Sequence, residues 1–291
     1  MNILITGANG QLGSELRAAA CSVADHHFIF TDYKELDITD SQAIQHMVQA
    51  EGVQVIINCA AYTQVDKAED DEAAADRLNH HAPAYLAAAA KDAGALLIHV
   101  STDYVFGGQG NTPFGEQATP APLGVYGRTK LAGEEAIRAT GCRHIILRTA
   151  WLYSTYGANF VKTMRRLMNE REELSVVYDQ VGSPTYARDL AAAILTILQT
   201  PGIDEKLGTY HFTNEGVCSW YDFALAIRHL SGLDAVCRVK PCRSSEFPAK
   251  VQRPSFSVLD KAAIKKTFGI EISHWLDSLH ECIVSLDVER L

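Results

Sequence analysis

The residues from Met1 to Gly13, MNILITGANGQLG, constrain the fold of this chain more than any other stretch. The apolar run at 2–6 has the length of one buried β-strand, and the pattern from Gln11 onward predicts a helix. Three glycines stand between the two: Gly7, Gly10 and Gly13. In a strand–turn–helix unit such glycines permit the turn, let the backbone approach a pyrophosphate, and let helix and strand pack closely. The stretch therefore predicts a dinucleotide site; a glycine-rich turn without a ligand is the alternative.

Composition limits the classes of protein to which the chain can belong. Its 291 residues suffice for one large α/β unit or for a domain with a smaller lobe. Hydrophobic residues make up 47%, as in ordinary globular enzymes, and the net charge of −9 argues against a surface for nucleic acid or acidic membranes. The seven cysteines form no C-x-x-C pair, and no run of 18 apolar residues occurs. Since a strand begins at once and leaves no room for a signal peptide, we expect a cytoplasmic protein with free thiols.

Predicted strands and helices alternate through the first half of the chain. After the first strand, further strands are expected at 27–31, 54–58, 95–101 and 144–149. Helices are expected at 41–50, at about 68–93 with an interruption at Pro83, and at 125–140. Because the strands are apolar throughout, they are typical of a parallel sheet that helices cover on both faces. We therefore predict an α/β fold with a doubly wound parallel (Rossmann) sheet.

Beyond residue 150 the alternation becomes irregular. Helices are expected at 160–169, 189–199, 221–230, 260–268 and 273–285, and strands at 174–178 and 209–212. We predict a dinucleotide-binding domain of residues 1–150 and about 179–200, and a smaller α/β substrate lobe of residues 151–178 and about 201–291. Ligands of open α/β sheets lie beyond the carboxyl ends of the strands, so a lobe there would cover a second ligand beside the nucleotide.

Tyr126 and Lys130 stand one turn apart on the helix expected at 125–140, so the phenol and the ammonium face the same side. A nearby ammonium favours phenolate, and we expect it to lower the pKa of Tyr126. Upstream, Thr102 follows the strand at 95–101, which places a hydroxyl at the edge of the sheet where ligands bind. The three residues predict a proton-transfer site. An ordinary amphipathic helix and a strand-ending turn are the alternatives.

Several motifs resemble a known family. The spacing G-x-x-G-x-x-G of the glycine turn resembles the extended members of the short-chain dehydrogenase/reductase superfamily, which modify nucleotide sugars. Among these members, the chain resembles the dTDP-4-dehydrorhamnose reductases in three segments: STDYVF (101–106), VYGRTKLAGE (125–134) and RTAWLY (148–153). Further similar segments are NCAAYTQVDKAE (58–69), NFVKTM (159–164) and DQVGSPTYARDLA (179–191). The resemblance covers residues 1 to about 200 and, more thinly, Arg253 and Pro254.

The resemblance implies a reaction and the residues that perform it. The reaction is reduction of the C4 ketone of dTDP-4-dehydro-L-rhamnose by NADPH or NADH, the last step of dTDP-rhamnose synthesis for polysaccharides. Tyr126 would donate a proton to the forming C4 alkoxide, Lys130 would hold the nicotinamide ribose, and Thr102 would bind the carbonyl oxygen. The implied cofactor residues are Gly7, Gly10, Gln11, Leu12, Gly13, Asp32, Asp37, Ile38, Ala61, Tyr62, Thr63, Tyr126 and Lys130. The implied substrate residues are Thr102, Asp103, Trp151 and Arg253.

Several of these positions have a second interpretation. Asp32, after the second strand, favours NAD over NADP, and Lys34 partly offsets its charge. Asp37 and Ile38 suit a turn as well as the adenine. Trp151 could belong to the core, since tryptophan is often mostly buried.

Charged residues that could bind the diphosphate or a metal have no motif of their own in the sequence. Arg253, with Lys250 nearby, is predicted to bind the dTDP diphosphate or to form a solvated surface pair. The eleven histidines, including the pair at 80–81, show no metal-ligand spacing with another histidine or carboxylate on one face, so we predict no catalytic metal. By the resemblance, Glu15 would match an acidic ligand of a divalent cation (Mg²⁺) at a homodimer contact, but the sequence near Arg188 departs from that pattern. Such a cation would be structural.

Two other functions are compatible with the motifs. One is a reductase or epimerase of another 4-keto nucleotide sugar, which shares the glycine turn and the three catalytic positions. The other is a non-catalytic NAD(P)-binding regulatory subunit, a role taken by a protein that resembles this family and binds methionine adenosyltransferase. A proton donor at Tyr126 argues against the second, because a binding module has no need for one.

Overall fold

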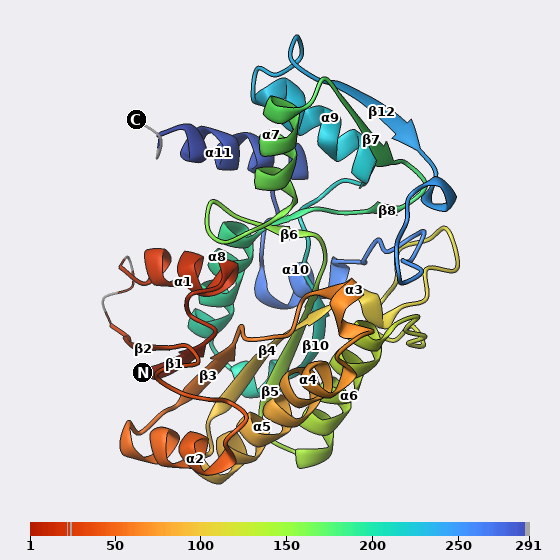
Figure 1. Ribbon diagram of the computed structural model, residues 1–291. Helices are drawn as coiled ribbons and strands as arrows, with labels where there is room; N and C mark the ends of the chain where they lie inside the picture. The colour runs from red at the N-terminus through yellow and green to blue at the C-terminus, as the bar shows by residue number, and fades with distance from the viewer. Residues whose placement is uncertain (22, 24, 289–291) are drawn as a thin grey trace.

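The computed structural model describes residues 1–21, 23 and 25–288. A six-stranded parallel sheet lies in the lower half of Figure 1, with helices around it. The strand order is β10–β5–β4–β3–β1–β2. The strands are β1 (Asn2–Thr6), β2 (His27–Thr31), β3 (Val55–Asn58), β4 (Leu96–Thr102), β5 (His144–Thr149) and β10 (Gly208–His211). This confirms the predicted doubly wound α/β fold. The direction of winding reverses between β1 and β3, which is where open α/β sheets bind their ligands.

Helices cover both faces of the sheet, because successive side chains of a strand point to opposite faces. On β1, Ile3 and Ile5 pack against one helical layer and Leu4 against the other. The first layer holds α1 (Gln11–Ala20), α8 (Ala187–Gln199) and α10 (Ala262–Phe268). The second layer holds α2 (Ser41–Ala50), α5 (Ala82–Ala93) and α6 (Val125–Thr140). Both sides of each central strand are therefore buried, which explains why the strands are apolar throughout.

A second buried cluster lies apart from the sheet, and most of the helices and strands that carry it are in the upper part of Figure 1. The stacked rings of Tyr153 and Tyr186, 5.4 Å apart, belong to it, together with Phe223. The helices are α7 (Phe160–Glu170), α9 (Trp220–Leu230) and α11 (Trp275–Val288). The paired strands are β7 (Glu173–Val177) with β12 (Arg238–Cys242), β6 (Leu152–Tyr153) with β9 (Thr185–Tyr186), and β8 (Val181–Gly182) with β11 (Cys218–Ser219). Short 3₁₀ turns lie at η2 (Asp103–Val105), η3 (Ile203–Lys206) and η4 (Ser244–Glu246).

The central sheet includes a strand that lies beyond the domain boundary expected near residue 201. Strand β10 pairs in parallel with β5 and so forms the sixth strand of the central sheet, although it lies in the range that we assigned to the second lobe. Helix α10 also packs against the sheet, through Ile264 and Phe268. The return of the chain to the sheet therefore extends beyond residue 200, and the division into two domains stays a prediction. No helix in the described part of the chain is long and apolar enough to cross a lipid bilayer.

The helix expected at about 68–93 consists of α3 (Val65–Ala68), α4 (Glu72–Asp76) and α5, and a π-helical turn, Arg77–His81, joins the last two. Pro83, in the first turn of α5, has no N–H for the carbonyl of Asn79. That carbonyl faces α6 instead, where a Cβ at Gly133 would lie 2.1 Å from its oxygen. Pro83 therefore does not interrupt the helical path; the turn widens to accommodate it.

Candidate active site

A cavity of about 760 Å³ opens at the carboxyl ends of the strands of the central sheet. The predicted site residues that line it are Gly7, Gly10, Gln11, Leu12, Asp32, Asp37, Ile38, Ala61, Thr63, Thr102, Asp103, Tyr126, Lys130, Trp151 and Arg253. Gly13 and Tyr62 do not line it. The structure thus brings residues from widely separated parts of the chain to one place, at the reversal of the strand order.

The glycine turn is closely packed and presents free backbone donors to the cavity. Helix α1 begins after Gly10, which has no side chain to cap its first N–H groups. Gly7 has a φ of +66°, and a Cβ there would lie 2.7 Å from the backbone nitrogen of Ala60. A Cβ at Gly13 would lie 2.4 Å from the carbonyl oxygen of Gly7, so Gly13 serves the close packing of helix and strand. An uncapped helix N-terminus beside a cavity suits a pyrophosphate.

Two carboxylates fix the cavity wall beyond β2. Asp32 accepts hydrogen bonds from the backbone N–H of Asn9, at 3.0 Å, and of Tyr33, at 2.8 Å. It is therefore held against the glycine turn, where a ribose would follow the pyrophosphate. Asp37 accepts from both the N–H and the hydroxyl of Thr39, so it forms a turn as well as lining the cavity.

Tyr62 is not brought to the cavity. Its backbone N–H donates to the side-chain oxygen of Asn79, at 2.8 Å, and its carbonyl accepts from the same side chain, at 3.1 Å. Its ring packs with Ala68, Ala75 and Val125. The buried Asn79 thus holds the main chain at Tyr62, whose contact with a cofactor stays a prediction.

Tyr126 is half-buried in the cavity wall, and a hydrogen bond joins it to the side chain of Thr102. Burial raises the pKa of Tyr126 to about 12, although this hydrogen bond acts in the opposite direction. The expectation that Lys130 lowers this pKa is wrong, because the lysine Nζ lies 2.7 Å from the carbonyl oxygen of Val100. Tyr126 is therefore a phenol at neutral pH, in the form that can donate a proton.

Lys130 ends a buried chain of polar groups that the sequence did not reveal. The backbone N–H of Ala60 donates to Oδ1 of Asn58, which leaves the Asn58 amide NH₂ to donate to Nδ1 of His99, at 3.0 Å. A neutral His99 then carries its proton on Nε2, which faces Nζ of Lys130 at 3.3 Å. Two donors would meet there if the lysine were charged. Burial lowers the pKa of Lys130 to about 8. The meeting of two donors disfavours the charged lysine and so acts on the pKa in the same direction.

A buried polar residue in an otherwise apolar strand is the signal that could have identified His99. His99 lies in β4 with no exposed surface, and Asn58 ends the neighbouring strand β3 opposite it. Burial and the neighbouring Lys130 hold the pKa of His99 well below its ordinary range. The imidazole is therefore neutral, and its Nε2 lies beside the lysine Nζ.

Asp103 and Trp151 lie where the cavity turns toward the second cluster. Burial raises the pKa of Asp103 to about 6, and its carboxylate accepts a hydrogen bond from the hydroxyl of Thr102 at 3.1 Å. Among the non-glycine residues of 1–21, 23 and 25–288, only Trp151 has a positive φ, +49°. Its ring stacks on Trp220 with centroids 3.6 Å apart. Trp151 is therefore both part of the aromatic packing and part of the cavity wall.

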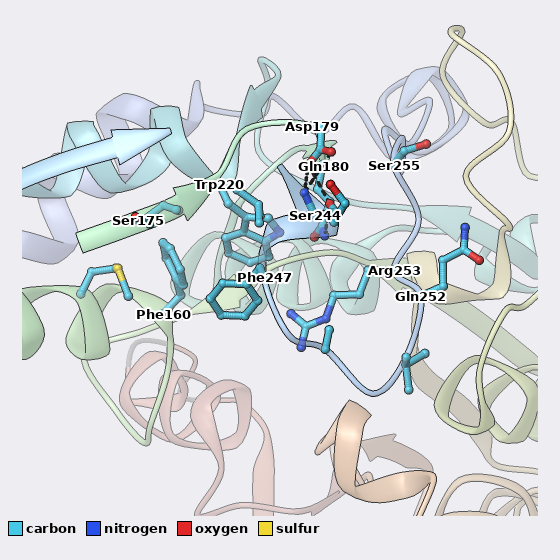
Figure 2. A pocket seen from close by; sticks show the side chains of 16 residues that line it. Phe160, Ser175, Asp179, Gln180, Trp220, Ser244, Phe247, Gln252, Arg253 and Ser255 are labelled. Atoms are coloured by element: carbon cyan, nitrogen blue, oxygen red, sulfur yellow. Dashed lines mark hydrogen bonds between the residues drawn. The ribbon is translucent and has the colours of Figure 1, made fainter. Parts of the chain in front are cut away.

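A second cavity has a volume of about 520 Å³, and Figure 2 shows the side chains that line it. Its wall holds the aromatic rings of Phe160, Trp220 and Phe247, with polar groups such as Gln180. Trp220 and Arg253 line both cavities. Arg253 donates to the carboxylate of Asp66 at 2.9 Å, while its Nε is buried without a partner. A cation with unused donors thus stands between the two spaces. Lys250 instead forms an exposed pair with Asp70.

The carboxylate of Glu15 is already engaged. It is buried, accepts a hydrogen bond from the hydroxyl of Ser154 at 2.6 Å, and lies 3.7 Å from Nε of Arg188.

The expectation that the histidines share no face with another ligand residue is wrong. Asp76, His80 and His81 converge on the outer side of the π-helical turn.

Comparisons with known proteins agree with this geometry. Residues 1–288 match the family model described as RmlD substrate binding domain. The chain is 40% identical over 283 residues to the dTDP-4-dehydrorhamnose reductase of Aggregatibacter actinomycetemcomitans, which covers 95% of this chain and 96% of that protein. A dTDP-4-dehydrorhamnose reductase from Clostridium acetobutylicum has a crystal structure similar over the whole length of both chains, with a TM-score of 0.93 and 43% identity. The Bacillus anthracis dTDP-4-dehydrorhamnose reductase, solved in complex with NADP, has a TM-score of 0.92 and 39% identity and covers 98% of this chain and 99% of that one.

Proposed function

The chain belongs to the RmlD substrate binding domain family, and we propose that it is the NAD(P)H-dependent reductase of dTDP-4-dehydro-L-rhamnose. The product is dTDP-L-rhamnose, so the reaction is the last step of dTDP-rhamnose synthesis. The observation that carries the proposal is the convergence of Thr102, Tyr126 and Lys130 with the glycine turn on one cavity. Relatives at about 40% identity bear the name of this activity over nearly their whole length.

The residues of the first cavity fit a dinucleotide. The uncapped start of α1 at Gly10 would receive the pyrophosphate, and Asp32 would bind the adenosine ribose. Lys130 would hold the nicotinamide ribose from the cavity wall. When bound, the reduced cofactor supplies the hydride. The NADP complex of a relative supports NADPH, while Asp32 favours NADH, so both cofactors are expected to serve.

Tyr126 acts as the general acid of the reduction. It donates its phenolic proton to the C4 oxygen of the sugar, and its pKa of about 12 ensures that the proton is present at neutral pH. Thr102, hydrogen-bonded to Tyr126, orients the carbonyl oxygen. Asp103 and Trp151 complete the wall on the sugar side. No step needs a metal ion.

The second cavity would take the nucleotide part of the substrate. Arg253 stands where both cavities meet and has free donors for a diphosphate, which a guanidinium binds well. The rings of Phe160, Trp220 and Phe247 offer apolar faces for a base. All seven cysteines are free thiols, which supports a cytoplasmic location. A homodimer is proposed from the resemblance alone.

Turnover of dTDP-4-dehydro-β-L-rhamnose with NADPH and with NADH tests the proposal. We expect wild type to oxidise either cofactor and Tyr126→Phe to lose about 10²- to 10⁴-fold in kcat while it still binds the cofactor. Tyr178→Phe, which removes an exposed phenol that lines neither cavity, serves as the control. Thermal stabilisation by NADPH without turnover would favour the regulatory subunit. Turnover only with another 4-keto nucleotide sugar would reassign the substrate.

A further inference from the structure

Three side chains converge on the outer side of the junction between α4 and α5. The carboxylate of Asp76 lies 3.0 Å from Nδ1 of His80 through one oxygen and 3.0 Å from Nε2 of His81 through the other. The two imidazole rings are stacked, with centroids 4.5 Å apart. The ligand atoms of all three residues lie within 4.8 Å of one another. Each side chain is partly exposed, so an ion can reach the cluster from solvent.

The π-helical turn explains why both histidines reach one carboxylate. In a regular α-helix, residues four apart share a face but residues five apart do not. Here the N–H of Ala82 donates to the carbonyl of Arg77, five residues back, so the turn holds one extra residue. His81 therefore joins His80 beside Asp76. The cause lies in the sequence two residues later, where Pro83 cannot donate to the preceding turn.

We propose that Asp76, His80 and His81 bind a divalent transition-metal ion such as Zn²⁺. Two imidazole nitrogens and one carboxylate oxygen form a donor set that Zn²⁺ accepts, with water in the remaining position. Mg²⁺ prefers oxygen ligands and would bind there poorly. π-turns inside helices are often found at functional sites. None of the three residues lines either cavity described above, so the site is separate from the active site.

The ion would stabilise the turn that supports the catalytic helix. Asn79 lies in the same turn, fully buried, and its amide donates to the hydroxyl of Thr129 on α6 at 3.2 Å. Through its other contacts Asn79 also holds the main chain at Tyr62. An ion bound to Asp76 and the two histidines would therefore hold the exposed side of the π-helical turn in place. The buried side of the same turn contacts α6. We expect the bound ion to raise the melting temperature of the full chain.

Calorimetric titration of the full-length chain with Zn²⁺, after removal of any affinity tag and of bound metal, tests the site. We expect one equivalent to bind to wild type and at least about ten-fold weaker binding to His81→Ala. Loss of a residue that only hydrogen-bonds to a metal ligand already lowers metal affinity by about ten-fold or more, and His81 would be a ligand itself. Asp76→Asn keeps the shape of the side chain and should show the same loss. His229→Ala is the matched control, because His229 is an exposed histidine paired with Asp234 at 3.0 Å, and it should bind as wild type does.

The exposed thiol of Cys21 is a competing zinc ligand, so Cys21→Ser is included. The proposal predicts that this variant keeps the full equivalent and that Co²⁺ binds with an absorption spectrum free of thiolate bands. The proposal is overturned if wild type binds no equivalent of Zn²⁺, if the equivalent disappears in Cys21→Ser, or if both His81→Ala and Asp76→Asn bind as tightly as wild type. Circular dichroism of each variant shows that it is folded.

Discussion

Replacement of Lys130 by methionine should make the ligand-free protein more stable and nearly inactive. Lys130 is 1% exposed, and burial lowers its pKa from 10.5 to about 8. A shift of this size corresponds to a cost of about 3 kcal/mol for the charged form. Methionine has a similar length and no charge, but it leaves the carbonyl of Val100 without its 2.7 Å hydrogen bond, which costs about 1 kcal/mol. The free energy of unfolding should therefore rise by about 2 kcal/mol at pH 7, or about 3 °C in Tm.

The pH dependence separates this cause from general packing effects. At pH 7 the lysine is charged in both the folded and the unfolded chain, so the full cost is present. Between a pKa of about 8 in the folded state and the ordinary value of 10.5, only the unfolded chain keeps the proton, so the stability of wild type rises with pH in this window. The advantage of Lys130→Met should consequently shrink by about 2 kcal/mol between pH 7 and pH 9.5.

Urea unfolding of both proteins at the two pH values measures this difference. All other titrating groups are shared, so the difference between the proteins isolates Lys130. Lys266→Met, at an exposed position on α10, is the control and should change stability by less than about 0.5 kcal/mol at either pH. A variant less stable than wild type at pH 7, or an advantage that is equal at both pH values, would refute the reasoning.

Three further substitutions test residues in the wall of the first cavity or in the glycine turn beside it. Gly13→Ala should lower the free energy of unfolding in urea by about 1–3 kcal/mol, because its Cβ would lie 2.4 Å from the carbonyl oxygen of Gly7. Asp32→Ala should raise the KM for NADH and lower that for NADPH, since it removes a ribose acceptor and a charge that repels the 2′-phosphate; an unchanged ratio of the two KM values would contradict this. In wild type, kcat/KM for the sugar nucleotide should fall as the pH drops through about 6, because Asp103 gains its proton there. A measured pH profile of Asp103→Asn should lack this fall.

The central elements could be predicted from sequence because their signals are local. The strand at Asn2–Thr6 and the helix at Val125–Thr140 have the predicted bounds, since apolar runs and helical spacing are properties of neighbouring residues. Strand β10 has equally clear local character, and its bounds are predicted within one residue. What the local pattern does not contain is its partner: β10 joins β5 in the central sheet, across more than fifty residues of intervening chain.

The errors within the site have the same origin. The spacing of Tyr126 and Lys130 correctly predicts one helical face, but the direction of the ammonium depends on the carbonyl of Val100 and on His99, which come from another element. Likewise, the two histidines after Asp76 converge only because Pro83 widens the helical turn. Period-based reasoning assumes 3.6 residues per turn and therefore misses a π-turn.

Burial shifts the pKa values of the two catalytic side chains in opposite directions, and its effect on Tyr126 suits a reduction. It raises the pKa of the Tyr126 phenol and lowers that of the Lys130 ammonium, so each group is shifted toward its neutral form. Reduction of a ketone begins with a phenol that still holds its proton, which this environment provides. Oxidation of the alcohol would begin with a phenolate, and forming one at pH 7 from a phenol with a pKa of about 12 costs about 7 kcal/mol. The environment of the ligand-free site thus keeps the proton on Tyr126 at neutral pH without any help from the lysine charge.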